Sequence, residues 1–158
     1  MRAEAFSMDA RRFLVVGLGC ERGTPPAELI ELARSVVSRP EDVAFVATLD
    51  MRADEPAMHA VARHFAVPLV TFPAGRLEAE TPRLANPSAV VFAHAGCHGV
   101  AEAAALAKAG AHARLVVEKT KSAHATVAIA ESHQGLAPSS LESDSLSSSI
   151  DSSRGGGA

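Results

Sequence analysis

Aromatic residues are scarce in this sequence, which has no tryptophan, no tyrosine and only 4% aromatic residues in all. Proteins that bind single-stranded nucleic acid use aromatic rings on which the bases stack, so the composition disfavours that class. A basic excess is also lacking, since the net charge is −3 and the pI is about 6.1. That balance disfavours a nucleic-acid binder with a broad basic face. We therefore expect no nucleic-acid partner.

Cysteines and long apolar runs are few as well. Two cysteines do not make a disulfide framework, and no apolar run approaches the length that spans a bilayer. The first residues, MRAEAFSMDARR, lack the apolar segment of a signal peptide. We therefore expect a cytoplasmic protein without membrane contact.

The composition divides the chain into three parts. The length of 158 residues suits one domain, and a hydrophobic content of 47% is enough for a core. Residues 131–158 are dominated by Ser, Gly and Asp without apolar periodicity, so we expect a disordered tail there and assign it no function. We place the folded domain at residues 12–130 and a flexible N-terminus at residues 1–11.

The first half of that domain alternates strand and helix patterns. Short apolar runs typical of buried parallel strands occupy residues 12–18, 42–50 and 67–72. Apolar stripes at helical spacing lie between them, with Thr24 and Asp54 as the expected N-caps and prolines in the first turns. This order predicts a parallel sheet with right-handed crossovers and helices on both faces.

The second half is less regular. Residues 85–96 suit a strand or a short helix, and Ser88 as cap with Gly96 as terminator favours the helix. Residues 99–110 are helical by their alanine content. Residues 114–118 and 125–130 are predicted strands, whose short link favours an antiparallel pair. The predicted fold is therefore α/β, a three-layer α/β/α domain with a mixed, mostly parallel sheet of about five strands.

A glycine-rich turn joins the first strand to the first helix. Gly17, Gly19 and Gly23 are spaced G-x-G-x-x-x-G, one residue longer than the dinucleotide fingerprint. Asp50 closes the second strand, where a ribose-binding acid would lie, but further along than usual. The bulky charged residues inside the turn suit a smaller anion or a carboxylate better than a pyrophosphate. A turn that only needs positive φ explains the glycines equally well, so these alternatives stay open.

Loops that follow parallel strands gather at one edge of a sheet, where ligands bind in open α/β folds. Four cations fall in the segments expected at that edge, namely Arg22, Arg52, Lys119 and Lys121. They could form a local positive rim on a protein of negative net charge. Ordinary solvated loop charge is the alternative.

Two kinds of chemistry are weaker candidates. His94, Cys97 and His98 are metal-ligand types that Cys20 or His124 could complete, but their spacing matches no strong metal pattern. Cys20 beside a histidine could act as a nucleophile. We expect no metal and no cofactor.

Four segments, in this order, resemble the family formed by CobE and the C-terminal domain of the cobalamin biosynthesis protein CbiG. They are VVGLGCERGTPPAEL, TLDMRADEPAM, GVAEAAAL and EKTKSAHATVAIA. The resemblance covers nearly all of residues 12–130 and implies a layered α/β/α domain with a mixed sheet. The chain carries none of the domains that precede this one in CbiG-like proteins, so it resembles the free-standing CobE type.

The resemblance implies a role in cobalamin biosynthesis at the corrin-ring stage, with a polycarboxylate precorrin bound or carried. CbiG-like proteins are associated with opening a δ-lactone of cobalt-precorrin-5A and losing acetaldehyde, so a hydrolase is the alternative, and a nucleotide-binding domain is a third. Whether the chain is catalytic stays open. The implied partners are a precorrin or another corrinoid, with other enzymes of the corrin pathway as further candidates.

The resemblance also implies a set of ligand-binding residues. Family members usually carry a basic residue in place of Glu21 and a lysine in place of Arg52. Cys20, Asp50 and Glu102 are the candidates for catalysis, with His98 as a further base. Because precorrins carry many carboxylates, we interpret the glycine turn as a cradle for a carboxylate rather than a phosphate. The implied ligand-binding residues are Gly19, Cys20, Arg22, Gly23, Thr24, Asp50, Arg52, Glu55, Gly99, Glu102, Lys119, Lys121 and Thr126.

Overall fold

A five-stranded sheet in the order β3-β2-β1-β5-β4 organises the protein. β1 pairs in parallel with β2, and β2 with β3, whereas β5 runs antiparallel to both β1 and β4. Four of the five strands therefore run in one direction, and the predicted mixed, mostly parallel sheet is confirmed. The strands are β1 (Leu14–Cys20), β2 (Val43–Leu49), β3 (Leu69–Phe72), β4 (Arg114–Lys121) and β5 (Ala125–Glu131).

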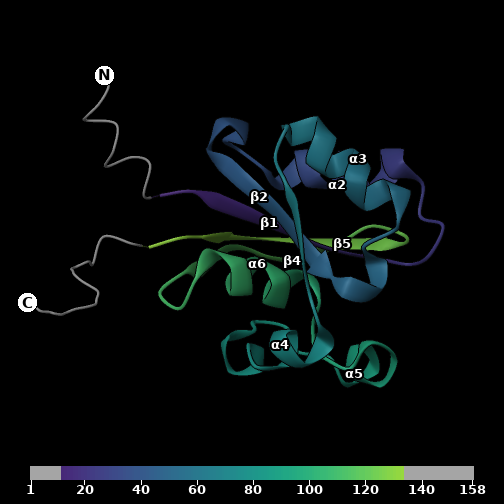
Figure 1. Ribbon diagram of the computed structural model, residues 1–158, viewed down its shortest axis with the longest axis vertical. Coiled ribbons are helices and arrows are strands. Elements are labelled where there is room, and N and C mark those ends of the chain that lie inside the picture. The colour runs from purple at the N-terminus through teal and green to yellow at the C-terminus, as the bar shows by residue number, and fades with distance from the viewer. Residues whose placement is uncertain (1–11, 134–158) are drawn as a thin grey trace, which may run out of the picture. The chain divides into compact units, whose positions relative to one another are not determined.

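Helices cover both faces of this sheet, as Figure 1 shows. α2 (Pro26–Val36) and α3 (Pro56–Phe65) pack on one face, and α6 (Ala101–Ala109) packs on the other. α4 (Ala74–Glu78) and α5 (Ala89–Ala95) lie on the α6 side. Three short 3₁₀ helices complete the elements, namely η1 (Pro40–Asp42), η2 (Asp50–Arg52) and η3 (Thr81–Arg83). The predicted three-layer α/β/α arrangement is confirmed.

The central strand explains why the sequence reads as a continuous apolar run. Val16 and Leu18 face α2 and α3, and Val15 faces α6, and all three side chains are fully buried. A parallel strand covered on both faces has no solvent side, so polar alternation disappears.

The computed structural model describes residues 12–133, so most of the predicted tail and the N-terminal segment 1–11 lie outside the described residues. Within that range, Phe13–Ser132 form one unit. β5 includes Glu131, and Ser132 exchanges hydrogen bonds with Phe13 in both directions. The sheet unit therefore continues for two residues beyond residue 130. No helix in the described range is long and apolar enough to cross a bilayer.

Both predicted N-caps were wrong by one residue. α2 starts at Pro26 with Pro25 in the cap position, and α3 starts at Pro56 with Glu55 in that position, neither cap using its side chain. The proline at the first helical position needs no N–H partner and has a preset φ, so a side-chain cap is less needed. Thr24 and Asp54 make other contacts, described below.

Two further elements test the sequence interpretation. Within residues 85–96 the chain does form a helix, α5 (Ala89–Ala95), before which the Ser88 hydroxyl accepts from the Val91 N–H and after which Gly96 adopts φ 79°. Lys119 and Lys121, however, were expected in a loop after the strand predicted at residues 114–118. They lie within β4, which is longer than predicted and is an outer strand of the sheet.

Candidate functional site

Each glycine of the G-x-G-x-x-x-G motif has a structural reason. A Cβ on Gly17 would lie 2.0 Å from the Ala101 carbonyl oxygen, because α6 packs directly on the backbone of β1. A Cβ on Gly19 would lie 2.7 Å from the Thr126 hydroxyl on β5. Gly23 has φ 80°, which residues with a Cβ adopt at a cost. Close packing and one left-handed turn account for the spacing without a nucleotide.

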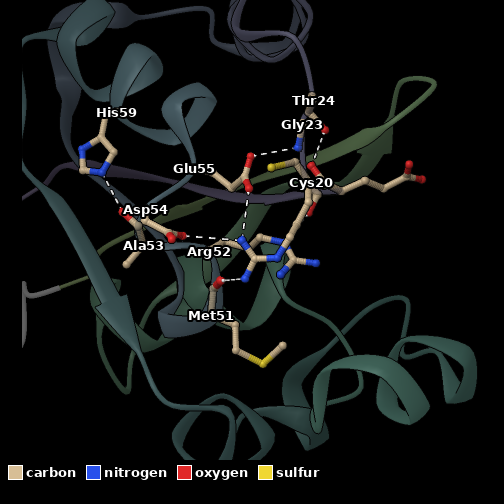
Figure 2. Close-up of polar contacts among 11 residues, drawn as sticks. Cys20, Gly23, Thr24, Met51, Arg52, Ala53, Asp54, Glu55 and His59 are labelled. Atoms are coloured by element: carbon tan, nitrogen blue, oxygen red, sulfur yellow. Dashed lines mark hydrogen bonds and ion pairs between the residues drawn. The ribbon is translucent and has the colours of Figure 1, made fainter.

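The glycine turn does hold a carboxylate, and it is the protein's own. The Gly23 N–H donates to Glu55 Oε1 at 3.1 Å, and Glu55 itself is buried at the start of α3 (Figure 2). The Thr24 hydroxyl donates to the Glu21 carbonyl at 2.6 Å and thereby closes the turn. Pro25 and Pro26 have no N–H to offer. The carboxylate expected from a ligand is thus replaced by Glu55.

The Arg22 side chain is paired with Glu55 as well, and with two residues beside it. Its guanidinium lies 3.3 Å from Glu55 and 3.7 Å from Asp54, and it donates to the Met51 carbonyl at 3.1 Å. Figure 2 draws these contacts as dashed lines from Glu55, Asp54 and Met51. Two carboxylates therefore offset the charge of Arg22 before any ligand arrives.

Cys20 and Arg52 meet beside this cluster. Arg52 Nε donates to the Cys20 carbonyl at 2.8 Å, which links the end of β1 to η2. Burial raises the pKa of the Cys20 thiol, although a hydrogen bond with Thr24 acts in the opposite direction. A thiol with a raised pKa is protonated near neutral pH and is a poor nucleophile.

Three other predicted residues share one row across the sheet. Gly19 on β1 pairs with Thr126 on β5, which pairs with Lys121 on β4. Directly opposed residues point to the same face, and here it is the α6 face, since Val100 beside α6 lies 3.5 Å from the position of a Gly19 Cβ. The resemblance therefore selected residues that converge in space.

Glu102 is buried at the start of α6, with 2% of its surface exposed, and its carboxylate is fully engaged. It accepts from the N–H groups of Ala85, Asn86 and Lys119 at 2.9 to 3.0 Å and from the Asn86 side chain at 2.8 Å. Burial alone would raise the pKa of Glu102, but these hydrogen bonds together hold it below its ordinary value. The carboxylate is ionised and saturated, which suits a structural anchor rather than a general base.

The two lysines of β4 differ from Arg22 and Glu102 in the partners of their side chains. Neither Lys119 nor Lys121 forms an ion pair or a side-chain hydrogen bond within residues 12–133. The Lys119 N–H donates to the Glu102 carboxylate, so the backbone that carries the Lys119 side chain is fixed. These two ammonium groups are available to an external anion.

Asp50 and Gly99 complete the predicted set. Asp50 is exposed at the start of η2, and its side chain has no partner in the described part of the chain. Gly99 is buried, and a Cβ there would lie 3.1 Å from Leu84. Asp50 thus lies at the carboxyl end of β2, whereas Gly99 allows close packing against Leu84.

The alternative metal ligands do not converge. His98 Nδ1 contacts the Glu78 carboxylate at 2.9 Å and its ring stacks on Phe92, while burial raises the pKa of the Cys97 thiol. Within residues 12–133, no group of three or more His, Cys, Asp or Glu could hold a metal ion.

Sequence reasoning missed a contact between α2 and the β4–β5 hairpin. The Glu28 carboxylate accepts from Ser122, from the His124 N–H at 2.7 Å, and contacts His124 Nδ1 at 2.8 Å. Bonds from Ser122 and His124 lower the pKa of Glu28 to about 2, and Glu28 in turn raises the pKa of His124. No local sequence pattern links Glu28 to a residue 94 positions away.

Comparisons with known proteins bear on this geometry. The family described as Cobalamin synthesis G C-terminus matches residues 14–130. This chain belongs to that family. A protein named CobE from Sinorhizobium sp. is 57% identical over 121 residues, covering 74% of this chain and 79% of the relative. A cobalt-precorrin-5A hydrolase from Priestia megaterium is 28% identical over 123 residues, covering 75% of this chain but only 32% of the relative.

Solved structures of the Cobalamin synthesis G C-terminus family agree with the fold. The crystal structure of CobE, from the cobalamin (vitamin B12) biosynthetic pathway, has a TM-score of 0.71 and 33% identity, covering 76% of this chain and 90% of that one. The structure of cobalamin biosynthesis protein chiG from Agrobacterium tumefaciens str. C58 has a TM-score of 0.56 and 34% identity, covering 74% of this chain and 96% of that one. The predicted family is therefore confirmed.

Proposed function

We propose that this protein binds a polycarboxylate corrinoid of the precorrin class at the sheet edge where β1, β2 and β4 end. The family is one of cobalamin synthesis, and corrinoid intermediates carry many carboxylates. The observation that carries the proposal is the pair of lysines on β4, whose charges have no partner within residues 12–133. Such ammonium groups suit carboxylates on a mobile ligand.

The state of the catalytic candidates favours binding or carrying over turnover. Glu102 accepts four hydrogen bonds within the protein, so its carboxylate has no free lone pair for a substrate. The Cys20 thiol has a raised pKa, and a protonated thiol is a poor nucleophile.

Hydrolysis of a corrinoid lactone is the second candidate, because one relative is named a cobalt-precorrin-5A hydrolase. Asp50 is the predicted catalytic residue that stays exposed and unpaired in the described range. A positioned carboxylate can act as a base on water. Release of acetaldehyde from a cobalt-precorrin-5A preparation, lost in Asp50→Asn, would replace the binding proposal by catalysis.

The direct test is a titration of hydrogenobyrinic acid, a stable polycarboxylate corrinoid, into the parent and a Lys119→Ala/Lys121→Ala variant. A hydrogen bond between a cation and a carboxylate contributes about 1.5 to 3 kcal/mol when partly desolvated. Loss of both should weaken binding by roughly two orders of magnitude or more. Affinity of the parent should also fall with added salt, since charges at the surface are screened.

Lys108→Ala is the matched control, because it removes the third lysine of the chain. Lys108 lies in the last turn of α6 over the Phe45 ring, 4.2 Å from its centroid, at the other end of the helix from Glu102. It should bind the corrinoid like the parent. Equal affinities for the parent and the double variant would overturn the proposal for this edge.

A further inference from the structure

Two arginines lie at this edge, and their guanidinium groups differ in how many partners they have within the protein. Arg22 is paired with Glu55 and Asp54 and donates to a carbonyl as well. Arg52 makes one side-chain hydrogen bond, from Nε to the Cys20 carbonyl at 2.8 Å, and no ion pair in the described part of the chain. The terminal nitrogens of Arg52 therefore keep all their donor capacity.

The hydrogen bond from Nε also orients the two terminal nitrogens of Arg52. A guanidinium is planar, so fixing Nε on a main-chain carbonyl fixes the plane in which the two terminal nitrogens lie. The carbonyl lies at the end of β1, whose other residues are buried, and Arg52 lies in η2, directly after β2 (Figure 2). Arg52 is also partly buried, so part of its hydration is already lost.

From these contacts, and resting on the proposed function, we propose that Arg52 selects a free carboxylate arm of the corrinoid over the corresponding amide. Two parallel terminal N–H groups match the two acceptor oxygens of a carboxylate. A primary amide offers one acceptor oxygen, and its own NH₂ would face a guanidinium N–H, donor against donor. The amide therefore loses one hydrogen bond and the charge, while an N–H of Arg52 stays unpaired.

Selection of this kind assigns the protein a place in a reaction sequence. Its ligand would carry at least one carboxylate arm that has not been amidated. A reaction class that converts such arms into amides would consume the ligand after release and weaken its return to the protein. Lysines contribute charge but less geometry, so Arg52 should account for more of the preference than either lysine of β4.

The test compares hydrogenobyrinic acid with the same compound after its carboxylates have been converted chemically to primary amides. The parent should bind the acid more tightly. Arg52→Ala should lose about 10- to 100-fold in affinity for the acid and less than about twofold for the amide. Arg52→Lys keeps the charge but not the planar fork, so its preference for the acid should be intermediate.

Arg63→Ala is the matched control, since Arg63 is an exposed arginine in the last turn of α3 whose side chain has no polar partner within residues 12–133. It should keep the parental ratio of affinities. Thermal unfolding of each variant shows whether it is folded, and Arg52→Gln replaces Arg52→Ala if the latter unfolds.

The outcomes separate this inference from the proposed function. If the parent binds the acid and Arg52→Ala keeps the full ratio of acid to amide affinity, the role of Arg52 is wrong while corrinoid binding stands. If the parent binds neither compound, the proposed function itself fails. A reduced ratio in Arg52→Ala, with the ratio kept in Arg63→Ala, supports the inference.

Discussion

The turn after β1 and the end of β4 lie at the same sheet edge, but their polar side chains differ in whether they have partners within the protein. In the turn, the Gly23 N–H and the Arg22 guanidinium both meet Glu55. At the end of β4, only the main chain of Lys119 is held, by Glu102, and the ammonium groups of Lys119 and Lys121 have no partner in the described range.

This difference shows that residue type at a strand end is a weak guide to binding. An external carboxylate in the glycine turn would have to displace Glu55, whose side chain is only 8% exposed. A buried carboxylate that loses its donors carries the full cost of desolvation. A carboxylate that approaches the lysines displaces only water. The internal partners of each group therefore decide where a ligand can bind.

The largest expected effect on stability comes from Glu102→Ala. It would leave the partly buried N–H groups of Asn86 and Lys119 without their acceptor. We expect a loss of about 2 to 4 kcal/mol in the free energy of unfolding, which lowers the thermal midpoint by on the order of 10 °C. Urea or thermal unfolding monitored by circular dichroism measures this loss.

Glu118→Ala is the control for that experiment. Glu118 is an exposed acid on β4, and it accepts one long hydrogen bond, 3.4 Å, from the Asn86 side chain. It should stay within about 0.5 kcal/mol of the parent. A Glu102→Ala variant as stable as Glu118→Ala would mean that Glu102 is not an anchor, and its role as a base would have to be reconsidered.

The glycine motif allows a sharper comparison within the turn region. Gly17→Ala places a Cβ within 2.0 Å of backbone on α6, which must move, so about 1 to 3 kcal/mol or more should be lost. Gly23→Ala meets nothing within 4 Å but keeps φ 80°, which costs about 1 kcal/mol. Chemical denaturation should give these losses in this order.

Gly75→Ala is the control, since a Cβ there also meets nothing within 4 Å and the residue lies in α4. It should be neutral or slightly stabilising, because alanine favours the helix. If Gly23→Ala costs more than Gly17→Ala, the close approach of α6 is not what requires the first glycine.

The fold could be predicted further than the contacts within it. The apolar runs predicted β1, β2 and β3, and in the mostly buried strands β1 and β2 coverage of both faces removes polar alternation. Ser88 and Gly96 identified α5 since capping is local chemistry. The length of β4 was missed because an edge strand with half-exposed side chains resembles a loop in composition.

The site was less predictable, for a physical reason. Whether Glu55 or Glu102 acts on a ligand depends on donors that come from other elements, and those donors are mostly main-chain N–H groups that every sequence contains. The family resemblance implied Gly19, Thr126 and Lys121 as ligand-binding residues, and these three lie in one row across the sheet. It could not show which charged residues are already paired.

The smallest effect concerns pH and the contact that joins the turn region to the β4–β5 hairpin. Glu28 has a pKa lowered from 4.5 to about 2 by Ser122 and His124, so its contribution is present above pH 4.5 and is lost as the pH falls toward 2. Glu28 raises the pKa of His124 above 6.5, with a smaller effect of Glu21, so that contribution is present below pH 6.5 and is lost as the pH rises through the raised value.

The contact should therefore be strongest between about pH 4.5 and 6.5. The His124 side chain is half exposed, so solvent and salt screen the pair and the effect should be small. The thermal midpoint of the parent minus that of Glu28→Gln should peak in this window and shrink on both sides. Glu31→Gln, an exposed acid of the same helix paired with Arg34, should show no such peak. Since the hairpin follows Lys121 directly, a flat difference for Glu28→Gln would mean that this contact does not hold the hairpin beside the turn, and that the end of β4 is positioned by Glu102 alone.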